Sequence, residues 1–304
     1  MSTPTGVLLM AHGTPDSPEA IAPFYTRIRR GSPPTPAQLA ELEQRYAAIG
    51  GVSPLTERTR AQVDGVRAAL EALAPGRYVV AFGAKHVDPD IEAAAAVLAA
   101  SGVDTVIGLV LTPHGSSMGA GEYLARARAA LDGACHFVAV PHWYAHPGLV
   151  ALLAERVGAA LAAADADRTP VLFTAHSLPE RVLAGGDTYP QQVEESARLV
   201  AAAAGVPRWQ VAWQSAGRTQ DTWIGPDVLD VVRQLGRRDD TDGVVVCPIG
   251  FVADHLEVLY DLDVEAAAAA AAAGLRFART RSLNDDPRFI AVLADVIHAA
   301  AEAA

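Results

Sequence analysis

Two sets of four short apolar segments, alternating with longer segments of helical periodicity, restrict this chain to few folds. The predicted strands span residues 6–11, 78–84, 105–112, 137–141, 171–175, 210–214, 243–248 and 275–280. The first seven are apolar on both faces, as parallel strands are when helices cover both sides of a sheet. The alternation of strand and helix therefore predicts an α/β fold built from open parallel sheets.

The two halves of the chain begin alike. Each starts with an apolar strand that ends in Ala-His and is followed by a small residue and a proline: Leu8-Leu9-Met10-Ala11-His12-Gly13-Thr14-Pro15 and Leu172-Phe173-Thr174-Ala175-His176-Ser177-Leu178-Pro179. A polar stretch at 164–170 separates them. We predict two similar α/β domains that face each other across a cleft. A single eight-stranded barrel is the alternative, which the extra helix near Pro36 and the polar break disfavour.

Composition excludes several classes of protein. Apolar residues make up 51% of the 304 residues, and the formal net charge is −11. Such an acidic chain is unsuited to bind nucleic acid or an anionic membrane through its charge, so we expect neither partner. The longest apolar run, 243–253, falls short of the roughly 18–20 residues of a membrane span, so we expect no transmembrane segment.

The start of the chain and its cysteines indicate the compartment. The first residues run directly into a strand, without the basic flank and cleavage site of a signal peptide. The two cysteines, Cys135 and Cys247, are far apart and form neither a disulfide framework nor a CxxC metal motif. We therefore expect a cytoplasmic protein.

Histidines recur where the predicted strands end. Ligands of open parallel sheets bind beyond the carboxyl ends of the strands. A single histidine there is more often a hydrogen-bonded structural residue, but five in one layer favour a site for a divalent metal such as iron, zinc, copper or nickel. The five are His12, His86, His114, His142 and His176.

A row of carboxylates begins shortly after the seventh strand. Glu257, Asp261 and Glu265 are spaced by four residues and stack along one face of an α-helix, where like charges cost about 0.2–0.5 kcal/mol per pair. A solvated acidic face and a row that conducts cations both fit this spacing. For Glu257 alone, a capping box with Asp254 is a third interpretation.

Other catalytic motifs are incomplete. The segment Gly119-Ala120-Gly121 lacks the third glycine of the dinucleotide-binding fingerprint, and the chain has no Walker A sequence. Ser177 is not part of a GxSxG elbow, which disfavours a hydrolase, and we interpret the segment from Ser177 to Glu180 as a capping box.

Several motifs, in order and over nearly the whole chain, resemble the ferrochelatase family. The first half contributes Ile28-Arg29-Arg30-Gly31 and Arg45-Tyr46-Ala47-Ala48-Ile49-Gly50-Gly51-Val52-Ser53-Pro54-Leu55. The second contributes Ala175-His176-Ser177-Leu178-Pro179, Gly185-Gly186-Asp187, Tyr189-Pro190, Trp213-Gln214-Ser215, Trp223-Ile224-Gly225-Pro226 and Gly250-Phe251-Val252-Ala253-Asp254-His255-Leu256-Glu257. The chain is most similar to the soluble, monofunctional ferrochelatases of Gram-positive bacteria.

The resemblance implies a fold and a reaction. The fold is two Rossmann-like domains, 1–165 and 166–285, around a porphyrin cleft, with the C-terminal helix, 286–304, packing back on the first domain. The reaction is insertion of ferrous iron into coproporphyrin III to give coproheme in haem biosynthesis. Porphyrin and Fe²⁺ are then the substrates, and neighbouring enzymes of the pathway are transient partners.

The resemblance also assigns roles to residues. His176 matches the histidine that faces the porphyrin centre, and Glu257 matches its acidic partner across the cleft. Asp261 and Glu265 match an acidic row on a helix with a π-bulge, a distortion common at functional sites. Further matches are substrate-binding positions: Arg45, Ser53 and Tyr123 for propionates, Arg29 for a pyrrole, and Lys85 with His86 at the cleft edge.

The chain departs from this family pattern at His12. The coproporphyrin-type relatives have a tyrosine there, which can ligate the product iron. A histidine in its place implies an axial nitrogen ligand, a shifted metal preference or slower product release. Some lineages also bind an iron–sulfur cluster through cysteines near the C-terminus. Because this chain has none there, we predict no cluster and no permanently bound cofactor.

These assignments lead to a hypothesis for the mechanism. Metal insertion requires a desolvated metal, removal of two pyrrole protons and a ring held out of plane, with about 1–5 kcal/mol of strain drawn from binding elsewhere. We expect neutral His176 on one face of the ring and Glu257 on the other. Asp261 and Glu265 then pass cations or protons. The sequence leaves open which of His176 and Glu257 takes the metal.

Three other functions remain in competition. The nearest is the same reaction on protoporphyrin IX, which has two propionates where coproporphyrin has four. The second is a cobalt or sirohydrochlorin chelatase, which the second-half motifs disfavour. The third is a haem or porphyrin carrier without turnover, which the presence of His176, Glu257, Asp261 and Glu265 disfavours and His12 keeps open.

Overall fold

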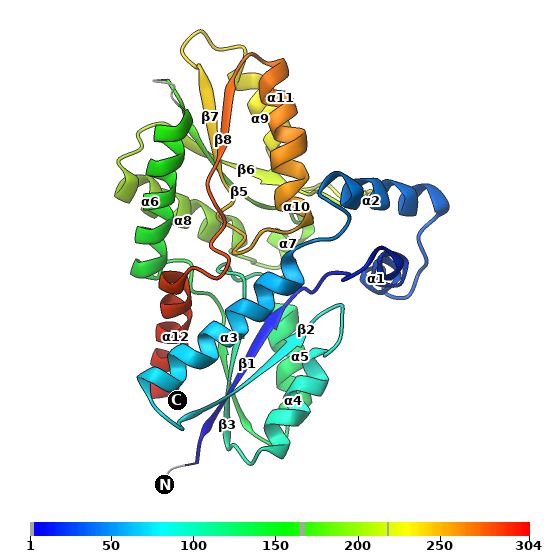
Figure 1. The fold of residues 1–304 in the computed structure, drawn as a ribbon, viewed down its shortest axis with the longest axis vertical. Helices are drawn as coiled ribbons and strands as arrows, with labels where there is room; N and C mark the ends of the chain where they lie inside the picture. Colours follow the sequence, from blue (N-terminus) through cyan, green and yellow to red (C-terminus); the bar gives the residue numbers. More distant parts are fainter. Residues whose placement is uncertain (1–2, 165–167, 218) are drawn as a thin grey trace.

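Two separate four-stranded parallel sheets form the centre of the molecule (Figure 1). The computed structural model describes residues 3–164, 168–217 and 219–304. The first sheet has the order β2-β1-β3-β4 and the second the order β6-β5-β7-β8. Their strands are β1 (Thr5–Ala11), β2 (Tyr78–Ala84), β3 (Thr105–Val110), β4 (His136–Val140), β5 (Val171–His176), β6 (Trp209–Gln214), β7 (Gly243–Cys247) and β8 (Arg276–Arg279). All eight predicted strands are confirmed, each end within two residues, and the single barrel is wrong.

The same strand order in both sheets places equivalent residues at equivalent sites. In each sheet the first strand lies between the second and the third, so the chain leaves it first to one side and then to the other. Ligands bind at the carboxyl end of such a switch point, because the helices diverge there. His12 directly follows β1, and His176 is the last residue of β5. The topology therefore presents one histidine from each half.

Helices cover both faces of each sheet. On the first sheet α4 and α5 cover one face and α3 and α12 the other, and on the second sheet α9 and α11 lie opposite α6 and α8. The helices are α1 (Ile21–Ile28), α2 (Pro36–Ala48), α3 (Leu55–Leu73), α4 (Ile91–Ala100), α5 (Ala120–Leu131), α6 (Pro147–Ala164), α7 (Arg181–Ala184), α8 (Tyr189–Ala204), α9 (Val228–Leu235), α10 (Leu256–Leu259), α11 (Ala267–Ala272) and α12 (Pro287–Glu302). A 3₁₀ turn (Pro18–Ala20) precedes α1, and a π-helical segment (Asp261–Ala266) joins α10 to α11.

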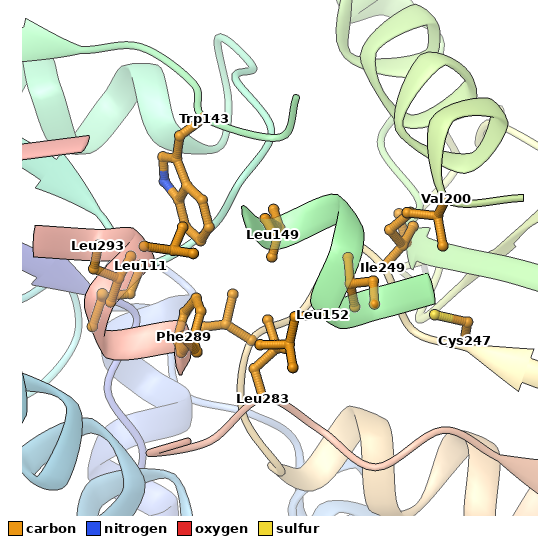
Figure 2. Packing of buried hydrophobic residues seen from close by; sticks show 14 of the residues in the cluster. Leu111, Trp143, Leu149, Leu152, Val200, Cys247, Ile249, Leu283, Phe289 and Leu293 are labelled. Carbon is orange, nitrogen blue, oxygen red and sulfur yellow. The ribbon is translucent and has the colours of Figure 1, made fainter. Parts of the chain in front are cut away.

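Two helices cross between the halves. The helix α6 follows β4 in the chain but packs on β7, β8 and α8 of the second half, whereas α12 follows β8 but packs on α3, β3 and β4 of the first. One hydrophobic cluster consequently runs through both halves. Figure 2 shows Phe289 and Leu293 of α12 beside Leu149 and Leu152 of α6. Since each fully buried side chain of this size contributes about 1.5–3 kcal/mol, this cluster fixes the halves against each other. The predicted domain boundary at residue 165 lies outside the described residues.

The helix α6 has the length and apolarity of a membrane span. Within the part of the chain that the structure describes, it is the one helix with both properties, with a mean hydropathy of 1.4. Its buried residues, 39% of the helix, pack against β7, β8, α8 and α12, as the apolar face of a helix in a globular protein does.

Candidate active site

His176 and Glu257 lie side by side at the carboxyl end of the second sheet. The His176 Nε2 atom is 3.5 Å from the Glu257 Oε1 atom. On its other side, His176 Nδ1 donates to the Ser177 carbonyl at 2.5 Å, so Nδ1 carries a proton and Nε2 faces the carboxylate. Glu257 comes from the first turn of α10, after a loop that passes close to β5.

Gly250 permits that close passage. Its N–H donates to the Thr174 carbonyl at 3.0 Å. A Cβ at this position would lie only 2.7 Å from the Cβ and 2.9 Å from the Cα of Ala175. Any side chain at residue 250 would therefore push the loop, and with it Glu257, away from His176.

This contact corrects the expected placement of the pair. From the sequence we expect His176 and Glu257 on opposite faces of a porphyrin, but both come from the second half and their polar atoms are 3.5 Å apart. A ring between them would need about 3.5–4 Å of contact distance on each side. The two residues must therefore act from one side of any bound ring.

Opposite charges hold the pair together. Burial disfavours the charged form of His176, but the charge and hydrogen bond of Glu257 raise the pKa of the imidazole to about 9. Burial likewise opposes ionisation of Glu257, yet His176 and His255 keep the pKa of its carboxyl well below the usual range. Both shifts favour the imidazolium and the carboxylate in the ligand-free protein, whereas the expected catalytic form of His176 is the neutral one.

Asp261 lies next along the row and has an unusual pKa. Ser215 donates to its Oδ2 atom at 2.5 Å, and an Arg45 Nη1 atom lies 3.5 Å from its Oδ1 atom. Burial, aided by the charges of Glu257 and Glu265, raises the pKa of Asp261 to about 7 against these two partners. This carboxyl can therefore hold or release a proton near neutral pH.

The helix that carries the row is π-helical from Asp261 to Ala266, as the resemblance implies. The Glu265 N–H bonds back to the Tyr260 carbonyl, five residues earlier. The wider turn rotates Glu265 away from the straight α-helical face that the spacing predicts, and its side chain lines a hollow beside α9. The charge of Glu265 still contributes to the raised pKa of Asp261.

Both predicted capping boxes are wrong. The helix α10 begins after His255 without a side-chain cap, and Asp254 instead accepts hydrogen bonds from Ser282 at 2.6 Å and Asn284 at 2.9 Å. Ser177 donates to the Ile224 carbonyl at 2.7 Å rather than capping a helix. Glu257 is therefore not explained by helix capping.

The loop before Glu257 is fastened to the first half. The Asp254 N–H donates to the Asn284 side chain at 2.9 Å. The backbone carbonyl of Asn284 in turn accepts from Gln62 of α3 at 2.8 Å. Asn284 adopts a left-handed conformation with φ of 47°, which is uncommon outside glycine and suits asparagine. This chain of contacts fixes the loop relative to the first sheet.

His12 occupies the equivalent place in the first half. Its Nδ1 atom donates to the Gly13 carbonyl at 3.0 Å, which leaves Nε2 with a free lone pair. The side chain is accessible, but surrounding protein lowers the pKa of the ring, and Lys85 and His255 lower it further against the effects of Gly13 and Glu257. His12 is therefore neutral at pH 7.

Aromatic and basic side chains surround His12. Its ring lies 4.6 Å from that of His86 and 6.0 Å from that of Phe24, measured between centroids. Burial, followed by the charges of His12 and Lys85, lowers the pKa of His86 to about 3. Lys85 forms an ion pair with Glu122 at 2.7 Å and lies 5.1 Å above the Tyr123 ring.

The expected substrate-binding residues lie in different settings. Arg45 pairs with Asp261, and its guanidinium stacks 4.9 Å from the centre of the Tyr260 ring. Arg29 follows α1 and donates through Nε to the Ser32 carbonyl at 3.2 Å. Ser53 is buried, and its hydroxyl accepts from the Leu55 N–H at 3.3 Å.

The charge of Glu257 reaches tyrosines from both halves. Burial raises the pKa of Tyr46 to about 12, and the Glu257 carboxylate adds to the increase. Burial, followed by the neighbouring carboxylates of Glu122 and Asp187, raises the pKa of Tyr123 in α5 and Tyr189 in α8, and the Glu257 charge adds to both increases. Helices of both halves therefore converge around Glu257.

The five strand-end histidines do not form one cluster. His12 pairs with His86, His176 pairs with Glu257, and His114 stacks on Tyr144 at 5.5 Å. His142 also packs against Tyr144, at 5.2 Å. Among the described residues, no three His, Cys, Asp or Glu side chains are placed to hold a metal together. The five histidines therefore lie at strand ends as predicted, but the described residues do not bring them together as one metal site.

Two functional neighbours were not predicted. His255 lies with Nε2 3.6 Å from the second Glu257 oxygen, and Ser215 binds Asp261. Both belong to motifs that carry the family resemblance, which is the signal that could have identified them. Ser215 has a φ of 60°, a rare conformation for serine that points to a positional requirement.

Comparison with known proteins agrees with this geometry. The ferrochelatase family model matches residues 4–301. A ferrochelatase of Herpetosiphon aurantiacus is 41% identical over 303 residues, covering 98% of this chain and 99% of that protein. The coproporphyrin III ferrochelatase of Geobacillus thermodenitrificans is 39% identical over 298 residues, covering 96% and 94%. A ferrochelatase of Thermus thermophilus is 42% identical over 314 residues, covering 97% and 98%.

Solved structures agree at the level of the fold. SirB from Bacillus subtilis with Fe³⁺ has a TM-score of 0.63 at 12% identity and covers 98% of this chain and 96% of its own. CbiX, the terminal enzyme of sirohaem biosynthesis in denitrifying bacteria, has a TM-score of 0.56 at 18% identity, covering 97% and 98%. By its sequence over nearly its whole length, this chain belongs to the ferrochelatase family.

Proposed function

We propose that this enzyme inserts ferrous iron into coproporphyrin III to give coproheme in haem biosynthesis. The observation that carries the proposal is the His176–Glu257 pair at the switch point of the second sheet, 3.5 Å apart and oppositely charged. The proposal is also supported by sequence similarity, over nearly the full length of the chain, to relatives named coproporphyrin III ferrochelatase.

The charge state of the pair suits an exchange of protons for metal. Insertion releases two pyrrole protons, and a base must accept them within hydrogen-bond reach. The pair holds one proton on His176, stabilised by the Glu257 carboxylate. A cation that approaches Glu257 competes with the imidazolium for that carboxylate, which lowers the pKa of His176 and frees Nε2 as a base. In this scheme Glu257 meets the metal and the displaced Nε2 proton leaves to solvent. His176 then accepts the two pyrrole protons one after the other, releasing the first to solvent before it takes the second.

The rest of the row is suited to carry charge away from the pair. Asp261 titrates near pH 7 and bonds to the Ser215 hydroxyl, so it can alternate between proton and cation. Glu265 follows at the surface end of the π-helical segment. A carboxyl with a pKa near the working pH is effective in transfer, because both of its states are populated.

His12 is proposed to face the ring from the side opposite the pair. It is neutral, its Nε2 lone pair is free, and it belongs to the first half. A neutral imidazole is a good ligand for iron. We therefore propose that His12 ligates the iron of the product.

The propionates are proposed to bind Arg45, Ser53 and Tyr123, with Arg29 against a pyrrole and with Lys85 and His86 at the edge. Guanidinium binds carboxylate through paired hydrogen bonds. Arg45 reaches Asp261, and Lys85 lies over Tyr123, so both cations lie close to the catalytic residues. The Ser53 hydroxyl already accepts a hydrogen bond from the Leu55 N–H, so it would bind a propionate by donating its own proton.

We further propose that the enzyme is cytoplasmic and needs no iron–sulfur cluster. Two cysteines, one of them buried in β7, cannot supply the four thiolates that such clusters use. Fe²⁺ and porphyrin are its substrates, and contacts with neighbouring enzymes of the pathway are transient. The packing of α6 in the core supports a location away from the membrane.

The substrate is tested by comparing two porphyrins with ferrous iron. We expect kcat/KM for coproporphyrin III to exceed that for protoporphyrin IX at least tenfold, because two additional propionates find cationic partners. Equal values would favour the protoporphyrin reaction, and tight binding of both porphyrins without turnover would favour a carrier. Arg30→Gln, which alters the arginine next to Arg29, is the matched control for Arg29→Gln in the same assay.

A further inference from the structure

A second hollow lies between α9 and α11, on the face of the second sheet away from α6 and α8. Figure 1 shows these two helices side by side. The hollow has a volume of about 560 Å³, which is within the usual range for small-molecule sites. Its lining includes Arg233, Arg237, Glu265, Ala268 and Ala272. It is separate from the His176–Glu257 pair but contains the last carboxylate of the acidic row.

Small side chains keep the hollow open. The helices touch where α9 ends, because Gly236 lies against Ala273: a Cβ on Gly236 would be 2.4 Å from the Ala273 Cβ and 2.8 Å from its carbonyl oxygen. From this contact toward Glu265, the wall is formed by Ala268, Ala269, Ala272 and Ala273 of the alanine run 266–273. Methyl groups cannot fill the space between two helices. The alanine run therefore forms a pocket rather than serving only as a helix former.

The charges at the pocket select a ligand that carries both signs. Arg233 and Arg237 are exposed on the α9 side, and Glu265 is half-buried on the other. Arg233 contacts Asp230 through one nitrogen, Nη1, at 2.9 Å. Two guanidinium groups repel a bare cation, and Glu265 repels a bare carboxylate. A metal ion bound to a small polycarboxylate satisfies both walls, since each charge meets its opposite.

We propose that this pocket receives the metal as a complex with a small polycarboxylate, whose free carboxylates bind Arg233 and Arg237 while the metal faces Glu265. The inference rests on the proposed function, because it makes the chelate the delivered form of the iron substrate. The metal then passes from Glu265 to Asp261, whose carboxyl feels the charge of Glu265, and the polycarboxylate stays at the arginines.

The first experiment measures binding without insertion. Zinc citrate, which is stable in air, is titrated into the porphyrin-free protein by calorimetry. We expect the double variant Arg233→Gln/Arg237→Gln to weaken zinc citrate binding about tenfold, because two exposed charge-assisted contacts are lost. The control is Arg238→Gln, since Arg238 pairs with Asp240 and lies outside the pocket lining. It should bind zinc citrate within twofold of the parent.

Two further variants test the shape of the pocket without changing its charges, and the active site without changing the pocket. Ala268→Leu keeps every charge but fills space, and it should weaken zinc citrate binding as well. Glu257→Gln impairs the proposed insertion while retaining zinc citrate binding, which makes failure of the two proposals distinguishable. In turnover, the ratio of kcat/KM with ferrous citrate to that with free ferrous iron should fall about tenfold in the arginine double variant.

Two results would overturn the inference. One is parental zinc citrate affinity in the double variant, which would remove the arginines from the site. The other is citrate alone binding as tightly as zinc citrate, because the pocket would then be an anion site with no role for the metal. A loss of affinity in Arg238→Gln equal to that of the double variant would count against the pocket as well.

Discussion

His12 and His176 hold equivalent places in the two halves but opposite charge states. Each stands at the end of the central strand of its sheet, and each donates through Nδ1 to the carbonyl of the next residue, Gly13 or Ser177. Yet the pKa of His12 is lowered, and that of His176 is raised to about 9. The repeated topology thus fixes the position of both rings and the hydrogen bond from Nδ1 without fixing their charge.

The neighbours of each ring explain the difference. His176 has the Glu257 carboxylate 3.5 Å from Nε2, and this charge outweighs the cost of burial. His12 has no carboxylate at that distance among the described ion pairs, and its neighbours are the His86 ring and the cation of Lys85. One half therefore carries an acid–base residue and the other a neutral nitrogen donor. The comparison indicates that divergence of a few neighbours gave the two halves different chemistry.

The largest expected loss of activity comes from removing the imidazole ring of His176. His176→Ala should reduce kcat for iron insertion about a thousandfold or more, because a positioned base contributes about 10²–10⁴. Porphyrin binding, followed by quenching of intrinsic fluorescence, should stay within a few-fold of the parent. Near-normal turnover would remove His176 from the mechanism.

The second largest expected loss of activity comes from Glu257→Gln, which removes the carboxylate that distinguishes His176 from His12. In Glu257→Gln the charge that raises the pKa of His176 is lost while burial remains, so this pKa should fall well below 9. We expect kcat to decrease about a hundredfold, with little change in porphyrin affinity. NMR titration of the His176 ring checks the first effect, and steady-state assays check the second.

The same variant changes the pH dependence of stability. A histidine with a raised folded pKa contributes stability that is complete below its unfolded pKa, near 6.5, and lost as pH rises through about 9. In Glu257→Gln this loss between pH 6.5 and 9 should disappear from denaturant midpoints. If the slope of the parent persists, Glu257 does not set the charge of His176.

Asp261→Asn should stabilise the protein above pH 7, whereas most substitutions of buried residues destabilise a protein. The folded pKa of Asp261 is about 7, whereas the unfolded value is near 3.8, so the unfolded state loses its proton first as pH rises. The parent consequently loses stability between about pH 4 and 7. Above pH 7 the variant should be more stable, by on the order of 3 kcal/mol, with no gain near pH 4.

Urea denaturation at pH 4.5 and pH 8 checks this stability effect. The matched control is Asp263→Asn, on the same π-helical segment. Asp263 is exposed and forms two hydrogen bonds with Arg279, at 2.7 and 2.8 Å. Its replacement should destabilise the protein slightly at both pH values. Equal behaviour of the two variants would show that Asp261 is not held near neutrality by burial.

The fold could be predicted closely from the sequence, because it depends on local patterns. Apolar runs and their bounding residues fixed the strands, and the repeated start around His12 and His176 indicated two sheets of equal order. The resemblance alone implied that α12 packs on the first half, and no pattern in the sequence predicted the position of α6. Each covers a sheet to which its own sequence neighbours do not belong, and amphipathicity shows that a helix packs but not on which partner.

The site could be predicted as residues but not as an arrangement. Strand ends placed His114 and His142 in one layer with His12, yet both of these rings pack against Tyr144, whereas His12 packs against His86. The contact of Arg45 with Asp261 joins α2 of the first half to the second half, and nothing local in either segment encodes it. Distances between elements arise from packing, which a single sequence does not display.

The smallest expected effect on rate comes from the neutral histidine, and it gives the sharpest test of the comparison. His12→Ala should leave kcat for insertion within about tenfold of the parent, because the proton-accepting pair lies in the other half. The absorption spectrum of the enzyme with bound iron coproporphyrin should change, since an axial nitrogen is lost. His86→Ala is the control: it removes the neighbouring ring, 4.6 Å away, and should preserve the spectrum of the parent. A spectrum that His86→Ala changes and His12→Ala does not would assign the ligand to His86, and the equivalence of the two strand-end histidines would then be one of position alone.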